Sequence, residues 1–130
     1  MADTEKITIN LSVVDLGRID LLVEQGFYST RTDFIRTAIR NQLGNHEQEI
    51  QGTITRKSIA VGVMTYNANS LEKKRRKKEM EEISVMGLLI LSNDITPELA
   101  KATIASINYF GVFEASSEVK EILKDRINQK

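Results

Sequence analysis

The stretch Glu5-Lys-Ile-Thr-Ile-Asn-Leu11 alternates strictly between polar and apolar side chains. Successive side chains of a β-strand point to opposite faces, so this alternation is typical of a strand with one buried face. The apolar face carries Ile7, Ile9 and Leu11, and the polar face carries Lys6, Thr8 and Asn10. Because a lone strand of about seven residues is not stable in water, the pattern predicts that this strand pairs with another.

Two amphipathic helices are predicted after this strand. Ser12 stands at an N-cap position, so we expect a first helix over residues 13–25 that is stopped by Gly26. Ser29 is expected to cap a second helix, with Gly44 as its stop signal. The positions expected on the buried faces are Leu16, Ile19, Leu22 and Val23 in the first helix, and Phe34, Ile35, Ala38, Ile39 and Leu43 in the second.

This strand and the two helices are too small to form a stable core alone, because about 45 residues is near the lower limit for independent folding. A two-fold dimer solves the problem. The two strands pair antiparallel, and the four helices cover their shared apolar face. The polar face then points outward as a two-stranded ribbon, which has the width to enter the major groove of B-DNA.

Residues 5–43 resemble the ribbon-helix-helix transcription factors of the CopG/Arc/MetJ superfamily. The resemblance rests on the order and spacing of Lys6–Leu11, the first helix, the turn Gly26-Phe-Tyr-Ser29 and the stretch Thr30–Arg40. It implies a dimer whose outward strand residues read bases and whose second helix holds a DNA phosphate at its start. The residues implied are Lys6, Thr8 and Asn10 as base readers, and Ser29, Thr30 and Arg31 as the phosphate anchor.

The charge of the chain is unevenly distributed. The net charge is zero, but residues 1–50 hold 5 basic and 8 acidic groups, whereas residues 51–82 hold 8 and 4. A DNA-binding domain usually carries a basic surface, and the N-terminal segment is acidic on balance. The basic surplus includes an uninterrupted run whose members are Lys73, Lys74, Arg75, Arg76, Lys77 and Lys78. Such a run is typical of a solvated surface, and here we also expect it to supply supplementary phosphate contacts.

The second half of the chain contains an internal repeat. Gly62, Gly87 and Gly111 are spaced by 25 and 24 residues, and each lies in a short apolar stretch followed by a polar turn and a helical pattern. The clearest predicted helix starts are at Thr96 and at Ser116 or Ser117. Apolar positions assigned to the last two helical patterns are Leu99, Ile104 and Ile107, then Val119, Ile122, Leu123 and Ile127.

The repeat predicts three strand–helix units that form a short right-handed solenoid or a parallel sheet. The strands are almost continuously apolar, which favours a sheet covered on both faces. We therefore expect an α+β protein with a ribbon-helix-helix domain over 1–46, a connector over 47–58 and a βα-repeat domain over 59–130. An exposed edge of the repeat domain favours self-association beyond the dimer.

Several classes of function are disfavoured by composition. The chain has no cysteine, so no thiolate metal site is expected. It has a single histidine, His46, and no catalytic Ser/His/Asp set is indicated around it. No signal sequence or membrane span is indicated, and a cytoplasmic location follows as an expectation. We expect no catalytic residue, metal or cofactor. The predicted function is that of a bacterial transcription regulator, a repressor, that binds double-stranded DNA as a homodimer.

Two alternatives remain open at the level of sequence. An antitoxin pairs the same kind of N-terminal domain with a segment that binds a toxin, but such segments are usually polar and fold on binding, whereas residues 59–130 show the periodicity of a core. A regulator that senses a small effector through residues 59–130 is the second alternative.

Overall fold

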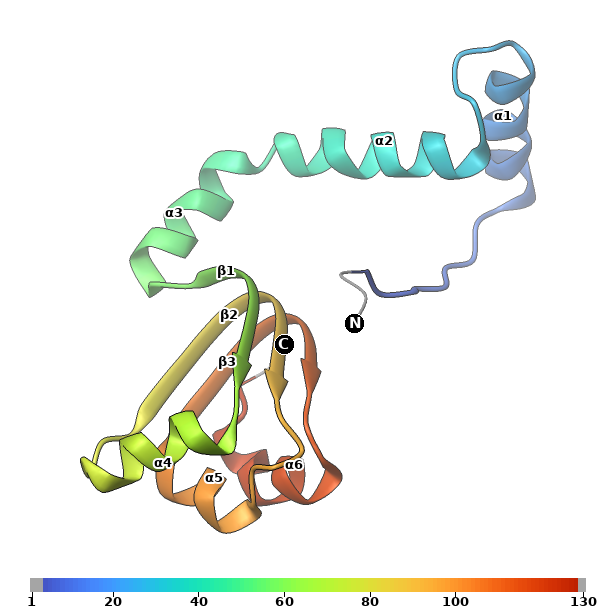
Figure 1. The fold of residues 1–130 in the computed structure, drawn as a ribbon. Helices are drawn as coiled ribbons and strands as arrows, with labels where there is room; N and C mark the ends of the chain where they lie inside the picture. Colours follow the sequence, from blue (N-terminus) through green and yellow to red (C-terminus); the bar gives the residue numbers. More distant parts are fainter. Residues whose placement is uncertain (1–3, 129–130) are drawn as a thin grey trace. The chain divides into compact units, whose positions relative to one another are not determined.

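The computed structural model describes residues 4–128 and has six α-helices, one short 3₁₀ helix and a three-stranded sheet among them. The elements in chain order are α1 (Val13–Glu24), α2 (Arg31–Gly44), α3 (Glu47–Lys57), β1 (Ala60–Tyr66), α4 (Ala68–Arg76), β2 (Glu81–Leu91), α5 (Pro97–Thr103), β3 (Ile104–Glu114), α6 (Ser117–Leu123) and η1 (Lys124–Arg126). Figure 1 shows their course. The predicted α+β class is confirmed.

The chain divides into two compact units. One comprises Lys6–Thr53, and the other comprises the residues from Ile54 onward together with Thr4 and Glu5. The division falls inside α3, so the stretch expected as a connector is helical. We call the first the helical unit and the second the sheet unit, and describe each separately.

The start and the end of α1 follow local sequence signals. The Ser12 hydroxyl accepts a hydrogen bond from the Asp15 amide at 3.0 Å, which satisfies one of the free N–H groups at the helix start. At the other end Gly26 has a φ of 87°, its amide donates to the Val23 carbonyl, and the next amide donates to Leu22. This pair of bonds is a Schellman motif, which requires a left-handed residue. Both predicted ends of this helix are confirmed to within one residue.

The segment before α1 forms no strand ladder within the described part of the single chain. Residues 4–12 are extended in Figure 1 but have no assigned secondary structure. A strand is defined by its hydrogen bonds to a neighbour, and the predicted neighbour is the same segment of a second copy. The ribbon therefore stays a prediction about the dimer.

The cap of α2 differs from the sequence prediction. Thr30, not Ser29, is the N-cap, because Thr30 has an extended backbone and its hydroxyl accepts from the Asp33 amide at 3.0 Å. The helix ends at Gly44, within one residue of the predicted end, but not by the expected glycine stop. Gly44 is helical, and Asn45 caps the helix in a right-handed conformation, so the chain turns directly into α3 without a left-handed residue.

Most of the apolar residues of the helical unit face water. Ile19 is its one buried hydrophobic among the described residues, although Phe34 and Leu22 are half-buried beside it. Large apolar side chains are exposed along the whole unit; they are Ile7, Ile9, Leu11, Val13, Val14, Leu21, Phe27, Ile39 and Leu43. Of the positions predicted to face the core, those of α1 are buried or half-buried, whereas Ala38, Ile39 and Leu43 of α2 are exposed in the single chain.

The sheet unit is built on three parallel strands in the order β1-β2-β3. Its register places Gly62 beside Gly87 and Gly87 beside Gly111. The internal repeat seen in the sequence is therefore a repeat of structure, and the parallel-sheet prediction is confirmed.

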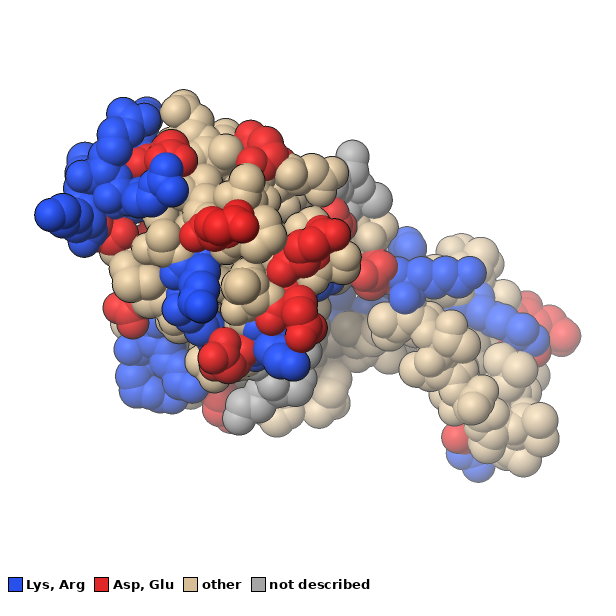
Figure 2. All heavy atoms as spheres, turned by 90° about the horizontal axis from the view of Figure 1, so that it is seen from below, with Lys and Arg blue, Asp and Glu red and all other residues tan. Residues whose placement is uncertain are grey.

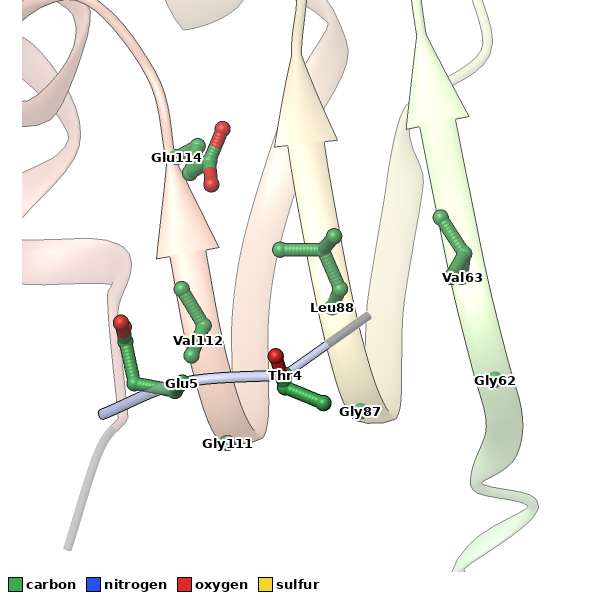
Figure 3. A pocket seen from close by; sticks show the side chains of 9 residues that line it. All are labelled: Thr4, Glu5, Gly62, Val63, Gly87, Leu88, Gly111, Val112 and Glu114. Atoms are coloured by element: carbon green, nitrogen blue, oxygen red, sulfur yellow. The ribbon is translucent and has the colours of Figure 1, made fainter. Parts of the chain in front are cut away.

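The three glycines form a row across the sheet, and the strands bend there. All three have φ values between 119° and 136°, a region that side-chain-bearing residues rarely adopt. Figure 3 shows β2 and β3 turning sharply at Gly87 and Gly111. A Cβ atom on Gly87 would lie 2.2 Å from the Gly62 carbonyl oxygen, and one on Gly111 would lie 2.2 Å from that of Gly87. Only glycine allows the neighbouring backbones to approach this closely.

Two details of the predicted repeat are wrong. Within the sheet unit, α4, α5 and α6 all lie on one side of the sheet, so these helices cover one face and leave the other uncovered (Figure 1). In addition, α5 ends at Thr103, and Ile104 and Ile107 belong to β3 rather than to a helix.

The core of the sheet unit lies between the bent sheet and its helices. Fully or nearly fully buried members are Leu71, Ile83, Val85, Leu89, Leu91, Ile95, Leu99, Ala100, Ile104, Ile107, Phe113, Val119 and Leu123. The buried Thr103 hydroxyl donates to the Leu99 carbonyl at 2.7 Å, so this polar group is satisfied inside the helix. The sheet unit therefore has a core of its own, which the helical unit lacks.

Candidate nucleic-acid interface

The three predicted base readers lie in the extended segment that precedes α1. Lys6, Thr8 and Asn10 are exposed, and they alternate with the equally exposed Ile7 and Ile9. A lysine ammonium donates hydrogen bonds, a threonine hydroxyl and an asparagine amide both donate and accept, and Asn can pair with the N6 and N7 positions of adenine. The segment therefore carries the groups that base edges require.

The apolar side chains of this segment have no cover in the single chain. Ile7 is 74% exposed and Ile9 is 62% exposed. The same unit contains an apolar hollow of 300 Å³ between α1 and α2, lined by Leu11, Asp15, Arg18, Ile19, Leu22 and Phe34. The helical unit thus has both an exposed apolar row and an apolar hollow, and two copies of the unit can cover these surfaces by packing against each other.

The predicted phosphate anchor lies at the start of α2, where its residues already bind carboxylates. The amide and the hydroxyl of Ser29 donate to the Asp33 carboxylate at 3.0 and 3.2 Å. The Asp33 amide in turn donates to Thr30, which closes a capping network around the first turn. One carboxylate thus occupies the helix N-terminus, the position that would attract a phosphate.

Arg31 is held by a second carboxylate. Its guanidinium donates to the two carboxylate oxygens of Asp20 in α1 at 2.7 and 2.8 Å. These hydrogen bonds, with the charge of Arg31, hold the pKa of Asp20 below its ordinary value. The pair is exposed, so it is weakly stabilising, but it fixes the direction of the Arg31 side chain.

Asp20 and Asp33 were not among the predicted site residues. A signal for Asp33 existed, because it lies three residues after Thr30 and follows the capping-box spacing with a shorter acid in place of Glu. Asp20 is 11 residues from Arg31. Their pairing depends on how α1 packs against α2, which no short-range pattern encodes.

The basic run lies at the end of α4 and in the turn that follows it. Lys74 pairs with Glu79 and Glu81 at 3.8 and 3.9 Å, and Arg75 pairs with Glu72. Among residues 4–128, the remaining members of the run form no ion pair; these are Lys73, Arg76, Lys77 and Lys78. Figure 2 shows a dense group of basic side chains on the left of the view, the side on which Figure 1 places the end of α4. We call Lys73, Arg76, Lys77 and Lys78 the basic cluster.

Lys78 has a left-handed backbone conformation. Its φ is 57°, and its amide donates to the Arg75 carbonyl while the Glu79 amide donates to Lys74, which is the Schellman arrangement that usually carries glycine. A lysine there costs conformational energy, and it presents a charged side chain at the tip of the turn.

A shallow pocket of 430 Å³ lies on the sheet face opposite the helices. Its floor is the glycine row with Val63, Leu88 and Val112, and Thr4, Glu5 and Glu114 complete the lining. Figure 3 shows these three aliphatic side chains on one face, with Thr4 and Glu5 crossing beside them. The lining is largely aliphatic, and its charged side chains are two carboxylates.

Within the described residues, no group of three or more His, Asp or Glu side chains could hold a metal ion. No helix of residues 4–128 is long and apolar enough to cross a membrane.

The N-terminal part of the chain is thus an exposed segment of alternating polar and apolar side chains followed by two capped helices, the order of elements typical of ribbon-helix-helix regulators. The chain belongs to the Ribbon-Helix-Helix transcriptional regulator family, whose family model matches residues 2–120. The match extends through the sheet unit as far as α6, so most of that unit belongs to the family as well. Among curated proteins and among solved structures, nothing matches the chain.

Proposed function

We propose that this regulator is a homodimer that reads the major groove of double-stranded DNA with a two-stranded antiparallel ribbon formed by residues 6–11. The observation that carries the proposal is the exposed apolar row of this segment next to the apolar hollow of the same unit. Burying one isoleucine contributes roughly 1.5–3 kcal/mol, so the paired ribbon supplies the core that the single helical unit lacks.

Pairing through the apolar row turns the polar row outward. Lys6, Thr8 and Asn10 of both copies then form one surface whose donors and acceptors match base edges. Family membership supports DNA binding, and the spacing of these residues supports their role as readers.

Ser29, Thr30 and Arg31 are the proposed phosphate anchor. Arg31 and Ser29 already donate hydrogen bonds to the carboxylates of Asp20 and Asp33, so a phosphate must displace one or both carboxylates. This competition lowers affinity for DNA in general, which is consistent with the acidic balance of residues 1–50. Binding then depends on the base contacts, so the carboxylates favour specific over non-specific complexes.

The basic cluster is the proposed source of supplementary phosphate contact. Its four unpaired cations are exposed at the end of α4 and in the turn that follows it, where they can approach a DNA backbone without losing an existing ion pair. We also propose that the protein acts as a repressor in the bacterial cytoplasm and that the sheet unit links dimers into larger assemblies. The preformed core of this unit argues against an antitoxin segment that folds on its toxin.

The base-reading role is tested by replacing Thr8 or Asn10 with Ala. After footprinting of genomic fragments has identified an operator, each variant is expected to lose roughly 1–3 kcal/mol of binding free energy on that operator and little on random duplex. Fluorescence anisotropy with both duplexes measures the difference. Thr55→Ala, at an exposed position of α3, is the matched control and should bind as the unmodified chain does. An equal loss on both duplexes would exclude base reading.

The basic cluster is tested by the double change Lys77→Gln and Lys78→Gln. Each phosphate contact releases condensed counterions from the DNA, so the loss of contacts should lower the affinity for all sequences together. The slope of log K against log[salt] should become shallower by about one for each contact that is lost. Lys101→Gln with Lys120→Gln removes the same charge from α5 and α6 and serves as the control. A salt slope that matches the control would assign the basic cluster to the solvated surface.

A further inference from the structure

The two edges of the sheet are protected to different degrees. At the β3 edge, Ile107 forms a bridge with Ile127, and the Asn128 amide donates to the Ile107 carbonyl at 2.7 Å. The residues after η1 therefore cover part of that edge. The β1 edge has no corresponding cover among the described residues of the sheet unit.

β1 also lacks the features that normally keep an edge strand from pairing. Proteins protect such edges with charged side chains, proline, bulges or short strands. The seven residues of β1, Ala-Val-Gly-Val-Met-Thr-Tyr, include neither charge nor proline, and the register with β2 runs without a shift. Val61 is 67% exposed and Val63 is 55% exposed.

Gly62 leaves open space at this edge for a further strand. It has the same kind of backbone as Gly87, with a φ of 126°, but a Cβ atom built on it meets nothing within 4 Å. At Gly87 the equivalent space is occupied by the carbonyl of the preceding strand. The β1 edge thus has the conformation of an interior position and open space where a neighbouring strand would approach.

We infer that β1 pairs antiparallel with β1 of a second copy of this chain, so that two sheet units share one continuous sheet. The second copy's β1 fits better than its β3, because the end of the chain partly covers the β3 edge. Pairing of identical edges closes about a two-fold axis, whereas β1-to-β3 pairing would repeat without limit. The pairing gives hydrogen-bond partners to the free backbone groups of the β1 edge. It also places the two exposed valines of each copy beside the β1 strand of the other copy.

This inference rests on the proposed ribbon dimer and deepens the proposed assembly role. The ribbon segment and β1 belong to different units of the chain, so each can pair with a different copy. The resulting assembly is a tetramer in which two ribbon dimers are linked through β1. Linking two DNA-binding dimers makes the second contact effectively intramolecular, which raises avidity on paired sites by roughly a hundredfold.

The test uses the full chain and light scattering coupled to gel filtration at micromolar concentration. The unmodified protein should be a tetramer, and the double variant Val61→Lys with Val63→Lys should be a dimer, because the pair would then hold four lysines, with the two at position 63 directly opposite each other. Ile122→Lys places one lysine at an exposed apolar position of α6 and should remain a tetramer. A dimer for the unmodified protein would overturn the inference.

DNA binding separates this inference from the proposed function. On a duplex with one site, the lysine variant should bind within about twofold of the unmodified chain, whereas on a duplex with two adjacent sites it should lose the avidity of roughly a hundredfold. If the lysine variant loses binding to the duplex with one site and has the mass of a monomer, the result contradicts the proposed ribbon dimer and not the β1 pairing.

A second variant tests the pairing directly and does not depend on lysine being tolerated. The chain has no cysteine, so Val63→Cys introduces one thiol at the centre of β1. In a fully overlapped antiparallel pair this residue faces its own copy, and mild oxidation should link two chains in high yield. Ile122→Cys should remain largely unlinked. Equal linking of the two variants would overturn the inference.

Discussion

Replacing Ile7 and Ile9 with Lys is expected to abolish the dimer and all sequence-specific DNA binding. Both side chains lie on the apolar row of residues 6–11 and are exposed in the single chain. In the proposed ribbon, four such isoleucines are buried in each dimer, and each contributes roughly 1.5–3 kcal/mol. Burying lysines in their place adds a charge-desolvation cost, so association at micromolar concentration should be lost.

The mass of the variant and its helix content measure this effect. If the helical unit depends on pairing, the loss of the dimer should also unfold α1 and α2, since Ile19 is their one buried hydrophobic among the described residues. Circular dichroism should then show reduced helicity, while the sheet unit remains folded. Ile7→Val with Ile9→Val keeps the apolar row and should remain associated. A lysine variant that is as large as the unmodified protein would show that the chains associate through a different surface.

Gly87→Ala is expected to disrupt the sheet unit. The new methyl group would lie 2.2 Å from the Gly62 carbonyl oxygen, a backbone atom that can move only if β1 moves with it. The positive φ adds strain of about 1–3 kcal/mol on its own. Together these costs are large against the 5–15 kcal/mol that stabilises a typical domain, so we expect the sheet unit to be largely unfolded.

Gly62→Ala is the matched control for this effect. Gly62 has nearly the same φ, but its Cβ would meet no atom within 4 Å in the single chain. In the single chain it bears the conformational strain without the backbone clash. Both substitutions are therefore made in the chain that carries Val61→Lys and Val63→Lys, whose β1 edge is not expected to pair. The difference in free energy of unfolding between them then isolates the close approach of β1 and β2. Thermal or urea unfolding followed by circular dichroism gives both values. Equal stabilities would mean that the strands separate easily at the glycine row.

Short-range signals account for the parts of the fold that were predicted well. Ser12 begins α1 and Gly26 ends it because capping involves atoms within a few residues of each other. The repeat of Gly62, Gly87 and Gly111 predicted three strand–helix units, and in the sheet these glycines lie side by side, since equivalent positions of a repeat stack in equivalent places. Where two hydroxyl residues adjoin, as at Ser29 and Thr30, the sequence favoured the wrong cap, because backbone conformation decides between them.

The remaining features depended on contacts between residues far apart in sequence. A continuously apolar strand is compatible with a sheet covered on one face or on both, and only the packing of the helices shows that a single face is covered here. The pairing of Arg31 with Asp20 likewise follows from how α1 lies against α2. The first leaves Val63, Leu88 and Val112 on an open face of the sheet, and the second places carboxylates at the proposed phosphate anchor.

The sequence by itself determined the family of this protein, the alternation of Lys6, Thr8 and Asn10 with an apolar row, and the repeated glycines, because each is a periodic pattern along one chain. The tertiary structure alone decided that the glycine row bends the sheet and that the β1 edge is open while the β3 edge is partly covered. Periodicity specifies which side of a strand is apolar. Whether that side or its edge is covered depends on distant residues, and their positions are set only when the whole unit packs.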